Sequence, residues 1–339
     1  MTDLGKVDRA FFDRYIYPNL GADRADVALG PQHGVDFGVV EVGGRAVVLA
    51  SDPLSLVPAL GFEKAGWFAV HVALSDAAVS GIPPSHLSVT FTLPPEMTDE
   101  EFGTVWKAFD REASELGVSI VTGHTARYGG CSYPWVGGAT ALAVGDPDEV
   151  VRPDGATPGD SLLVTKGPGI EVAGFLVTLF EEAVDLPQST IETAKERFWD
   201  MSPVRDALTA AAAGPVTAMH DATEGGLRGA LIELAEAGGV RLDVDSDAVP
   251  VLPGVAESCE FFGIDPWAAT SEGTLLLTVE SGGVESVLSA LDAEGIPAAE
   301  IGEVREGDGV FVDGERAEKP ESDPSWEVFD EYAEEVGLE

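Results

Sequence analysis

Short apolar strands alternate with helical stripes along nearly the whole sequence, and this alternation constrains the fold more than any other feature. Two strand-like runs, 37–42 and 45–50, flank Gly43-Gly44, which has the spacing of a two-residue hairpin turn. Residues 64–80 are apolar nearly all round, which predicts a helix that is buried on every side. The pattern therefore predicts a mixed α/β or α+β fold.

A segment rich in proline, glycine and charge, residues 146–160, divides the sequence into two halves. This composition between two apolar strands is typical of a linker. We predict an N-terminal domain over 1–150, a C-terminal domain over 151–312 and an acidic, partly mobile tail over 313–339. The other expected strands are 86–93, 118–122, 136–144, 161–165, 215–220, 241–244, 274–279 and 300–304, and the other expected helices are 6–16, 98–116, 172–182, 203–213, 226–237 and 284–294, with a short helix between 244 and 274.

The 339-residue chain is strongly acidic, with 60 aspartates and glutamates against 19 lysines and arginines and a formal net charge of -41. Such a charge repels nucleic acid and anionic membranes, so we expect neither as a partner. A surface adapted to a salt-rich cytoplasm explains an excess of acid that extends along the whole chain. The alternative, a patch for a cationic partner, requires one dense acidic block, and only the tail from Glu306 comes close, with 13 acidic and two basic residues.

The two cysteines, Cys131 and Cys259, have no cysteine or histidine partner at metal-ligand spacing. The sequence therefore predicts neither a disulfide framework nor a zinc site. The first residues lack a hydrophobic signal region, and the longest uncharged runs are broken by glycine, proline and histidine. We expect a cytoplasmic protein without a membrane partner.

Aspartates interrupt the apolar pattern at four places: Asp36 at a strand start, Asp52 after a strand, Asp76 inside the apolar helix and Asp221 after another strand. A buried carboxylate is costly, so each requires a cap role, a cationic partner or a metal. Any one of them taken alone is well explained as a cap or a solvated side chain. Together they have the distribution of carboxylates that hold Mg²⁺ against a polyphosphate, which predicts a Mg-nucleotide substrate.

Two glycine-containing turns lead from a strand to a helix. In the first, Asp221 precedes Glu224 by three residues, as in a capping box, and Gly225-Gly226 follows. A well-capped helix explains this turn, but the two glycines also allow a ligand to approach the backbone, and a helix N-terminus favours an anion. In the second, 165–169, Lys166 is one of only six lysines. No nucleotide-binding loop of the common types occurs elsewhere in the sequence.

Six segments together resemble the AIR synthase (PurM-like) superfamily over roughly residues 35–304, and their order and spacing are most similar to its HypE-like, AIR synthase-related branch. The segments are Ser51-Asp52-Pro53; the helix from Ala69-Val70-His71 to Ser75-Asp76 with Ser80-Gly81-Ile82-Pro83 after it; Val121-Thr122-Gly123-His124-Thr125; Pro158-Gly159-Asp160; Asp221-Ala222-Thr223-Glu224-Gly225-Gly226-Leu227; and Ser271-Glu272-Gly273-Thr274.

The resemblance implies a two-domain PurM-like fold in which ATP binds near a dimer interface of the N-terminal domain and Mg²⁺ is the metal. It further implies the following roles: Asp36, Asp52 and Asp76 for the metal; Asp52, Ser75, Asp76, Gly123, His124, Thr125 and Lys166 for ATP; Glu224, Gly225, Gly226 and Glu272 for the substrate; and Asp221 and His124 for catalysis. The sequence departs from the family pattern at Ser75, where an asparagine is usual, and at His124, where an aspartate is usual.

The resemblance implies an ATP-dependent enzyme that transfers a phosphoryl group to an oxygen atom of its substrate. A thiamine-monophosphate kinase-like enzyme is one alternative, and a nucleotide-binding protein without turnover is another. The HypE-like branch carries a terminal cysteine that it modifies, whereas this sequence ends Glu335-Val336-Gly337-Leu338-Glu339. We therefore expect no self-modification of a terminal cysteine, and the acceptor stays open.

A homodimer is also expected from the pattern of elements. Two helices, 64–80 and 98–116, are too few to cover both faces of the N-terminal strands. One face of that sheet is therefore predicted to meet the same face of a second copy.

If the acidic surface is halophilic, folding should require salt, because mobile ions screen the repulsion among uncompensated charges. We expect the thermal midpoint to rise from low to molar KCl, as followed by circular dichroism. A midpoint that does not change with KCl would contradict a halophilic surface and favour a cationic partner.

Overall fold

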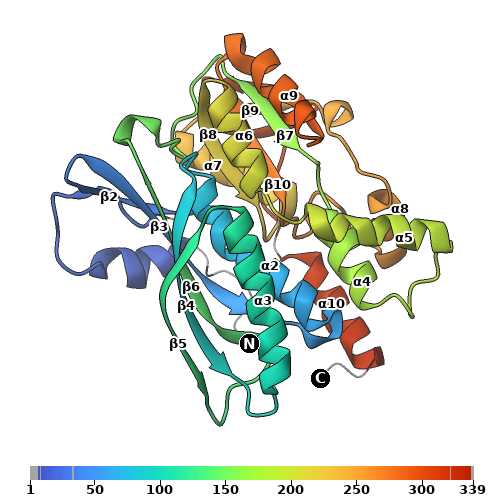
Figure 1. Ribbon diagram of the computed structural model, residues 1–339. Coiled ribbons are helices and arrows are strands. Elements are labelled where there is room, and N and C mark those ends of the chain that lie inside the picture. Colours follow the sequence, from blue (N-terminus) through green and yellow to red (C-terminus); the bar gives the residue numbers. More distant parts are fainter. Residues whose placement is uncertain (1–6, 8, 33, 321, 337–339) are drawn as a thin grey trace.

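The computed structural model describes residues 7, 9–32, 34–320 and 322–336 (Figure 1). Two β-sheets, one from each half of the chain, form its framework, and helices pack against both. The first sheet has the strand order β1-β2-β3-β6-β4-β5 and is antiparallel except where β4 pairs with β5. Its strands are β1 (Val27–Leu29), β2 (Gly38–Val42), β3 (Arg45–Ser55), β4 (Pro84–Leu93), β5 (Ser119–Arg127) and β6 (Trp135–Gly145).

Helices α2 (Phe62–Ala78) and α3 (Asp99–Glu115) cover one face of this sheet (Figure 1). The α3 helix begins with a capping box, in which the Thr98 hydroxyl accepts from the Glu101 amide and the Glu101 carboxylate accepts from the Thr98 amide. Helix α2 is buried over most of its surface because it lies between α3 and the second half of the chain. The predicted buried helix is therefore confirmed.

The other face of the first sheet exposes aliphatic side chains. Register places Val27, Val40, Val47 and Val144 opposite one another on β1, β2, β3 and β6. Val27 and Val144 are 45% and 41% exposed, whereas Ala46 and Val48, which point to the helices, are buried. The structure thus leaves on this face a row of valines that α2 and α3 do not cover.

The second sheet has the order β13-β12-β9-β11-β7-β10-β8. Helices α6 and α9 cover one face, and α7 covers the other. The strands are β7 (Ser161–Thr165), β8 (Val216–Ala222), β9 (Arg241–Val244), β10 (Thr274–Val279), β11 (Ala298–Arg305), β12 (Gly309–Val312) and β13 (Glu315–Arg316); the helices of this half are α4 (Val177–Leu179), α5 (Gln188–Glu196), α6 (Val204–Ala213), α7 (Gly226–Gly238), α8 (Val255–Phe262), α9 (Val284–Ala293) and α10 (Pro324–Val336).

The two halves share one apolar core. A single cluster of buried side chains contains Val70 and Ala77 of α2 together with Ala207 of α6 and Leu275 of β10. Gly81 lies at this contact with a φ of +75°, and a Cβ there would lie 3.1 Å from the Cβ of Ala211. The halves therefore pack directly against each other.

Most expected elements are present, but several boundaries differ in ways that concern the site. Strand β3 continues through Asp52, and β5 continues through His124, so both residues lie within strands rather than after them. The expected capping box of Asp221 and Glu224 is wrong, because Asp221 belongs to β8 and α7 has Gly225 as its N-cap without a side-chain cap. The expected helix over 172–182 is a π-helical segment, Val172–Leu176, followed by the short α4.

The acidic tail contains a helix, α10 (Pro324–Val336), that the sequence pattern did not indicate. Within it, α10 packs on a second apolar cluster, where Phe329 and Tyr332 contact the buried Phe180. The leading segment, by contrast, forms only a short helix, α1 (Arg9–Phe11), and two further helical turns up to Asn19 whose residues are largely exposed.

Both cysteines are free, Cys259 buried and Cys131 half-buried. Burial raises the pKa of the Cys259 thiol to about 12. In the described part of the chain, no helix has the length and apolar character that crossing a membrane requires.

Candidate functional site

Carboxyl side chains from both halves meet where the C-terminal end of α2 contacts the second sheet. Glu272 lies in the turn before β10, and its Oε1 accepts a hydrogen bond of 3.0 Å from the Ser75 hydroxyl of α2. Both side chains are buried. The contact joins helix α2 to the turn 271–274, across 197 positions of the sequence.

Burial raises the pKa of Glu272 well above its usual range, and the charges of Asp221 and Glu171 raise it further. The charge of Asp52, on β3, acts in the same direction. Three of the sequence-predicted residues, Asp52, Asp221 and Glu272, therefore belong to one electrostatic group. This shift favours the protonated, neutral form of Glu272.

Glu171 is a further carboxyl group of this site. Its Oε2 accepts hydrogen bonds from the Thr270 hydroxyl at 2.8 Å and from the Glu272 amide at 3.1 Å. Burial raises its pKa to about 7, against the opposing effect of these two hydrogen bonds. Glu171 thus holds the backbone amide of Glu272 in place, and the two carboxyl groups lie in the same low-dielectric surroundings.

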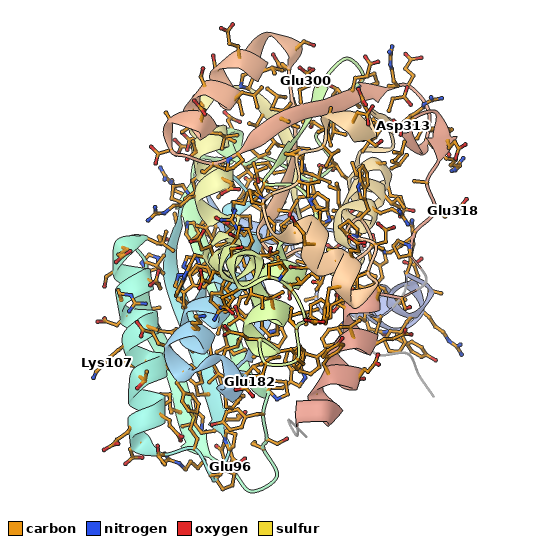
Figure 2. All side chains as sticks on the ribbon, turned by 90° about the vertical axis from the view of Figure 1, so that its right-hand side faces the viewer. Glu96, Lys107, Glu182, Glu300, Asp313 and Glu318 are labelled. Atoms are coloured by element: carbon orange, nitrogen blue, oxygen red, sulfur yellow. The ribbon has the colours of Figure 1, made fainter. Side chains whose placement is uncertain are left out.

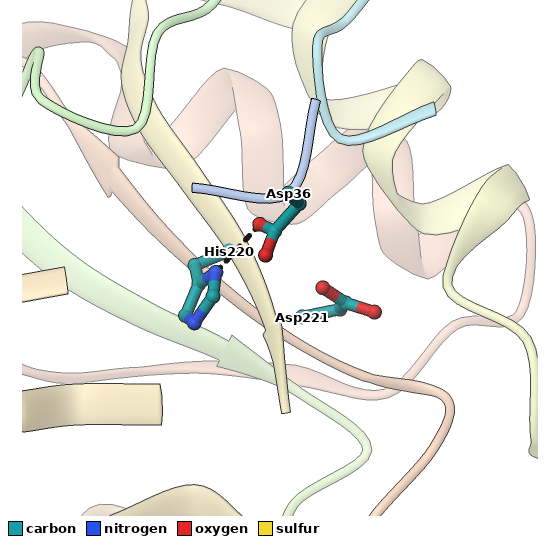
Figure 3. A group of neighbouring side chains, drawn as sticks. All are labelled: Asp36, His220 and Asp221. Atoms are coloured by element: carbon teal, nitrogen blue, oxygen red, sulfur yellow. Dashed lines mark hydrogen bonds and ion pairs between the residues drawn. The ribbon is translucent and has the colours of Figure 1, made fainter. Parts of the chain in front are cut away.

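Asp36, His220 and Asp221 form a second group beside the first (Figure 3). His220 Nδ1 donates to Asp36 Oδ2 at 2.6 Å, and Nε2 donates to Glu233 Oε2 at 3.1 Å. Burial lowers the pKa of His220, but the two carboxylates outweigh it and leave the pKa well above the usual value. The ring is therefore an imidazolium with both nitrogens engaged as donors.

The donor atoms here suit a divalent cation such as Mg²⁺. Carboxylate oxygens of Asp36 and Asp221 and a ring nitrogen of His220 lie within 4.8 Å of one another. An imidazolium has no lone pair to offer a metal, so the aspartates supply the ligands. Hard oxygen ligands are those that Mg²⁺ prefers, and Asp221 is buried and Asp36 half-buried, which limits competition from water.

Lys166 is buried, and its backbone has a φ of +61°. Its ammonium donates to the carbonyl oxygens of Asp200, Ser202 and Gly273 at 2.8–3.1 Å and lies 3.1 Å from Asp206. These contacts hold the turn that carries Glu272 against the loop before α6. Contact between Lys166 and a nucleotide stays a prediction, since the structure has the ammonium engaged within the chain.

The Gly225-Gly226 turn has a local structural reason for each glycine. Gly225 has a φ of +79°, and a Cβ on Gly226 would lie 2.3 Å from the carbonyl oxygen of Ala269. The Gly225 amide, where an anion was expected, donates to Asp323 Oδ2 at 2.9 Å. A carboxylate of the chain's own C-terminal segment thus lies at the predicted anion position, next to the half-buried Glu224.

The Gly123-His124-Thr125 segment lies on edge strand β5. In the sheet register Asp52, Ala139, Val89 and Gly123 form one row, and a Cβ on Gly123 would lie 2.1 Å from the Val89 carbonyl oxygen. His124 belongs to the next row and therefore points to the face away from α2.

On that face His124 Nε2 lies 2.8 Å from the Tyr128 hydroxyl, with the two rings stacked. Thr125 and His124 are both exposed. The described chain thus brings Asp36, Asp52, Ser75, Asp221 and Glu272 to one region, with Asp76 following Ser75 on α2, and places His124 elsewhere.

A second buried histidine also links the halves. His71 of α2 accepts from the Ser202 hydroxyl at 2.7 Å, and its Nε2 donates to Glu112 of α3 at 3.2 Å. Burial lowers the pKa of His71, so this ring is neutral. It differs in charge from His220 although both are buried at the contact between the halves.

Sequence reasoning missed Glu171, Glu233 and Asp323. Glu171 could have been suspected, because it is a lone acid between two apolar stretches, as Asp76 is. Glu233 lies in the expected helix 226–237 and Asp323 in the acidic tail, and in so acidic a sequence a single acid in either place carries no signal. His220 was noted only as the neighbour of Asp221.

Known proteins confirm the resemblance. Residues 34–146 match the N-terminal domain, and residues 157–315 the C-terminal domain, of AIR synthase related proteins. The chain therefore belongs to the AIR synthase related family. Carbamoyl dehydratase HypE of Rhizobium leguminosarum bv. viciae is 30% identical over 82% of this chain and 79% of its own length.

Solved structures show the same fold. The crystal structure of E. coli HypE superposes with a TM-score of 0.71 at 28% identity and covers 83% of this chain and 88% of its own. The structure of hydrogenase maturation protein HypE in complex with ATP superposes with a TM-score of 0.68 at 24% identity and covers 92% of both chains. The predicted PurM-like fold is confirmed.

The buried Glu171 makes stability depend on pH. Its folded pKa of about 7 lies above the ordinary 4.5, so its burial costs nothing below pH 4.5 and its full amount above pH 7. Glu171→Gln removes this titration and keeps an oxygen that accepts from Thr270. We expect the unfolding free energy of the variant, relative to the wild type, to be about 2–3 kcal/mol higher at pH 8 than at pH 5.

Chemical denaturation in molar KCl measures this difference, since salt reduces the contribution of the remaining surface charge. A difference between variant and wild type that stays constant from pH 5 to pH 8 would show that Glu171 is ionised in the folded protein.

Proposed function

We propose that this protein is an ATP-dependent enzyme of the HypE-like group that transfers a phosphoryl group from Mg-ATP to an oxygen atom of its substrate. The observation that carries the proposal is the convergence of Asp36 and Asp52 from the first half with Asp221 and Glu272 from the second. Family membership supports it, and the HypE structure in complex with ATP shares the fold.

Asp36 and Asp52, with Asp76 near them on α2, would hold Mg²⁺, which neutralises phosphate charge when bound. Gly123 and Thr125 would contact the nucleotide from the Asp52 face of the sheet, and His124 from the other face. Because one chain places that face away from Asp52, this assignment requires a second copy or a nucleotide that extends around the sheet edge.

The pair of Asp221 and Glu272 would serve the acceptor. Two neighbouring carboxyl groups whose surroundings favour different protonation states provide an acid and a base at the same pH. Glu272 holds the proton, since burial and Asp221 raise its pKa, and Asp221 would accept the proton of the attacking oxygen. Glu224, Gly225 and Gly226 would line the substrate side.

The acidic residues extend over the outside of both halves, as Glu96, Glu182, Glu300, Asp313 and Glu318 illustrate (Figure 2). We include a salt-rich cytoplasm in the proposal, because a surface acidic on all sides suits solvation in salt better than one docking patch.

The metal and nucleotide assignment is tested with Asp52→Asn and Asp76→Asn. Each substitution removes a negative charge but keeps the shape, so we expect Mg-ATP affinity to fall about tenfold or more with the fold intact. Isothermal titration calorimetry measures binding and circular dichroism the fold. Asp99→Asn is the matched control, since Asp99 lies on α3 with 93% of its side chain exposed, and should bind like the wild type.

Wild-type affinity in both site variants would contradict the assignment. ADP release, measured with and without candidate acceptors, separates an enzyme from a binding protein without turnover. Thiamine monophosphate among these acceptors tests the kinase alternative directly.

We also propose that the row of Val27, Val40, Val47 and Val144 meets the same face of a second copy. Light scattering in molar KCl should then give about twice the 35.3 kDa of one chain. Val144→Lys, which places a charge in the interface, should give monomers, whereas Val251→Lys, at a 50% exposed position of the other half, should not. A monomeric wild type at micromolar concentration would contradict this interface.

A further inference from the structure

His220 connects the two halves at the point where the metal is expected. It lies on β8 of the second sheet, and its Nδ1 donates across the boundary to Asp36, in the segment before β2. The side chains of His220 and Asp36 are 4% and 9% exposed. The hydrogen bond is short, 2.6 Å, and both of its side chains are largely shielded from water.

The ring is itself held from its other side. Nε2 donates to Glu233 of α7, and Lys319 donates to the second oxygen of Glu233 at 2.7 Å. Glu233 is largely buried, and burial raises its pKa, but His220 and Lys319 together lower it below the usual range. The series Lys319, Glu233, His220 and Asp36 alternates in charge, so each member fixes the next.

The hydrogen bond from His220 engages Oδ2 of Asp36 and thereby fixes the direction of its Oδ1. His220 Nδ1 donates to Oδ2, and a carboxylate oxygen of Asp221, which points to the other side of strand β8, belongs to the same group of atoms within 4.8 Å of one another (Figure 3). A carboxylate that accepts a charged hydrogen bond on one oxygen is oriented to bind a cation through the other. Without that bond Asp36 would keep the rotational freedom of a segment that belongs to no helix or strand.

We infer that His220 is a positioning residue that orients Asp36 toward the divalent cation of the proposed site. The inference rests on the proposed function, because it presupposes that a cation binds here. It goes beyond that proposal by assigning to the histidine a defined role: it touches neither metal nor substrate and acts through Asp36.

His220→Gln tests this role, since glutamine has one nitrogen donor group and one acceptor oxygen where the ring presents a nitrogen to each of Asp36 and Glu233. We measure Mn²⁺ binding to the full chain by electron paramagnetic resonance, in the presence of a non-hydrolysable ATP analogue. We expect about a tenfold or larger loss of Mn²⁺ affinity. On an Asp36→Asn background the same substitution should change the affinity by less than twofold, because its effect passes through Asp36.

His71→Gln is the matched control. His71 is also a buried ring that bridges the halves, but it contacts Ser202 and Glu112 instead of Asp36. We expect this variant to lose thermal stability and to keep Mn²⁺ affinity within threefold of the wild type. Equal losses in the His71 and His220 variants would assign the effect to general loosening and overturn the inference.

A measurement on the wild type covers the case in which His220→Gln does not fold. Nitrogen-15 NMR of the five histidine rings should show one ring with both nitrogens hydrogen-bonded, whose signals shift when Mg²⁺ and the analogue are added. Absence of such a ring overturns the positioning role. Absence of Mn²⁺ binding in the wild type overturns the proposed function as well, whereas wild-type affinity in His220→Gln overturns the positioning role alone.

Discussion

Like charges buried in one low-dielectric region constrain the rest of this structure. The charges of Asp221, Glu171 and Asp52 all raise the pKa of the buried Glu272, and like charges in such surroundings favour a bound proton or a cation. The chain meets this constraint in two ways. The raised pKa favours a proton on Glu272, and the neighbouring Asp36 is hydrogen-bonded by His220, whose other ring nitrogen contacts Glu233. The packing of α2 against the second sheet brings these groups together, so the charge pattern depends directly on the contact between the halves.

Histidine illustrates how surroundings decide chemistry. His71 and His220 are both buried and both bridge the halves, yet one ring is neutral and the other charged. The difference lies in their partners, since His71 has one carboxylate and a hydroxyl, whereas His220 lies between two carboxylates. Two hydrogen-bonded negative charges outweigh the cost of burial, and one does not.

The alternation of strands and helices predicted the framework well, because apolar periodicity reports burial directly. The strands 241–244 and 274–279 agree with β9 and β10 to the residue. The ends of β3 and β5 could not be predicted, since Asp52 and Gly123 look like turn residues and only pairing with β6 and β4 keeps them extended. The C-terminal α10 was missed because its acidic residues resemble a solvated tail. Its docking depends on Phe329 and Tyr332, whose partners lie about 150 positions earlier.

The candidate site was predicted in part. The structure does bring together Asp36, Asp52, Asp221, Ser75 and Glu272. The aspartates stood out because each interrupts an apolar pattern, and an acid in such a pattern lies where apolar elements pack together. The sequence could not reveal that His124 points to the sheet face opposite Asp52, because the face to which a side chain points depends on how the strands pair. It also could not reveal that Asp323 lies at the Gly225 amide, which requires the path of the whole C-terminal segment.

The apolar core that continues from Val70 of α2 to Leu275 of β10 limits how a ligand can reach this site. Enzymes with separate domains often open by a hinge, and the cost of opening is then small because the interface between domains is wet and polar. Here a hinge would expose side chains that are fully buried, at about 25 cal/mol for each Å² of apolar surface. The shared core therefore opposes a hinge between the two sheets, because hinge opening would cost free energy in proportion to the apolar surface that it exposes.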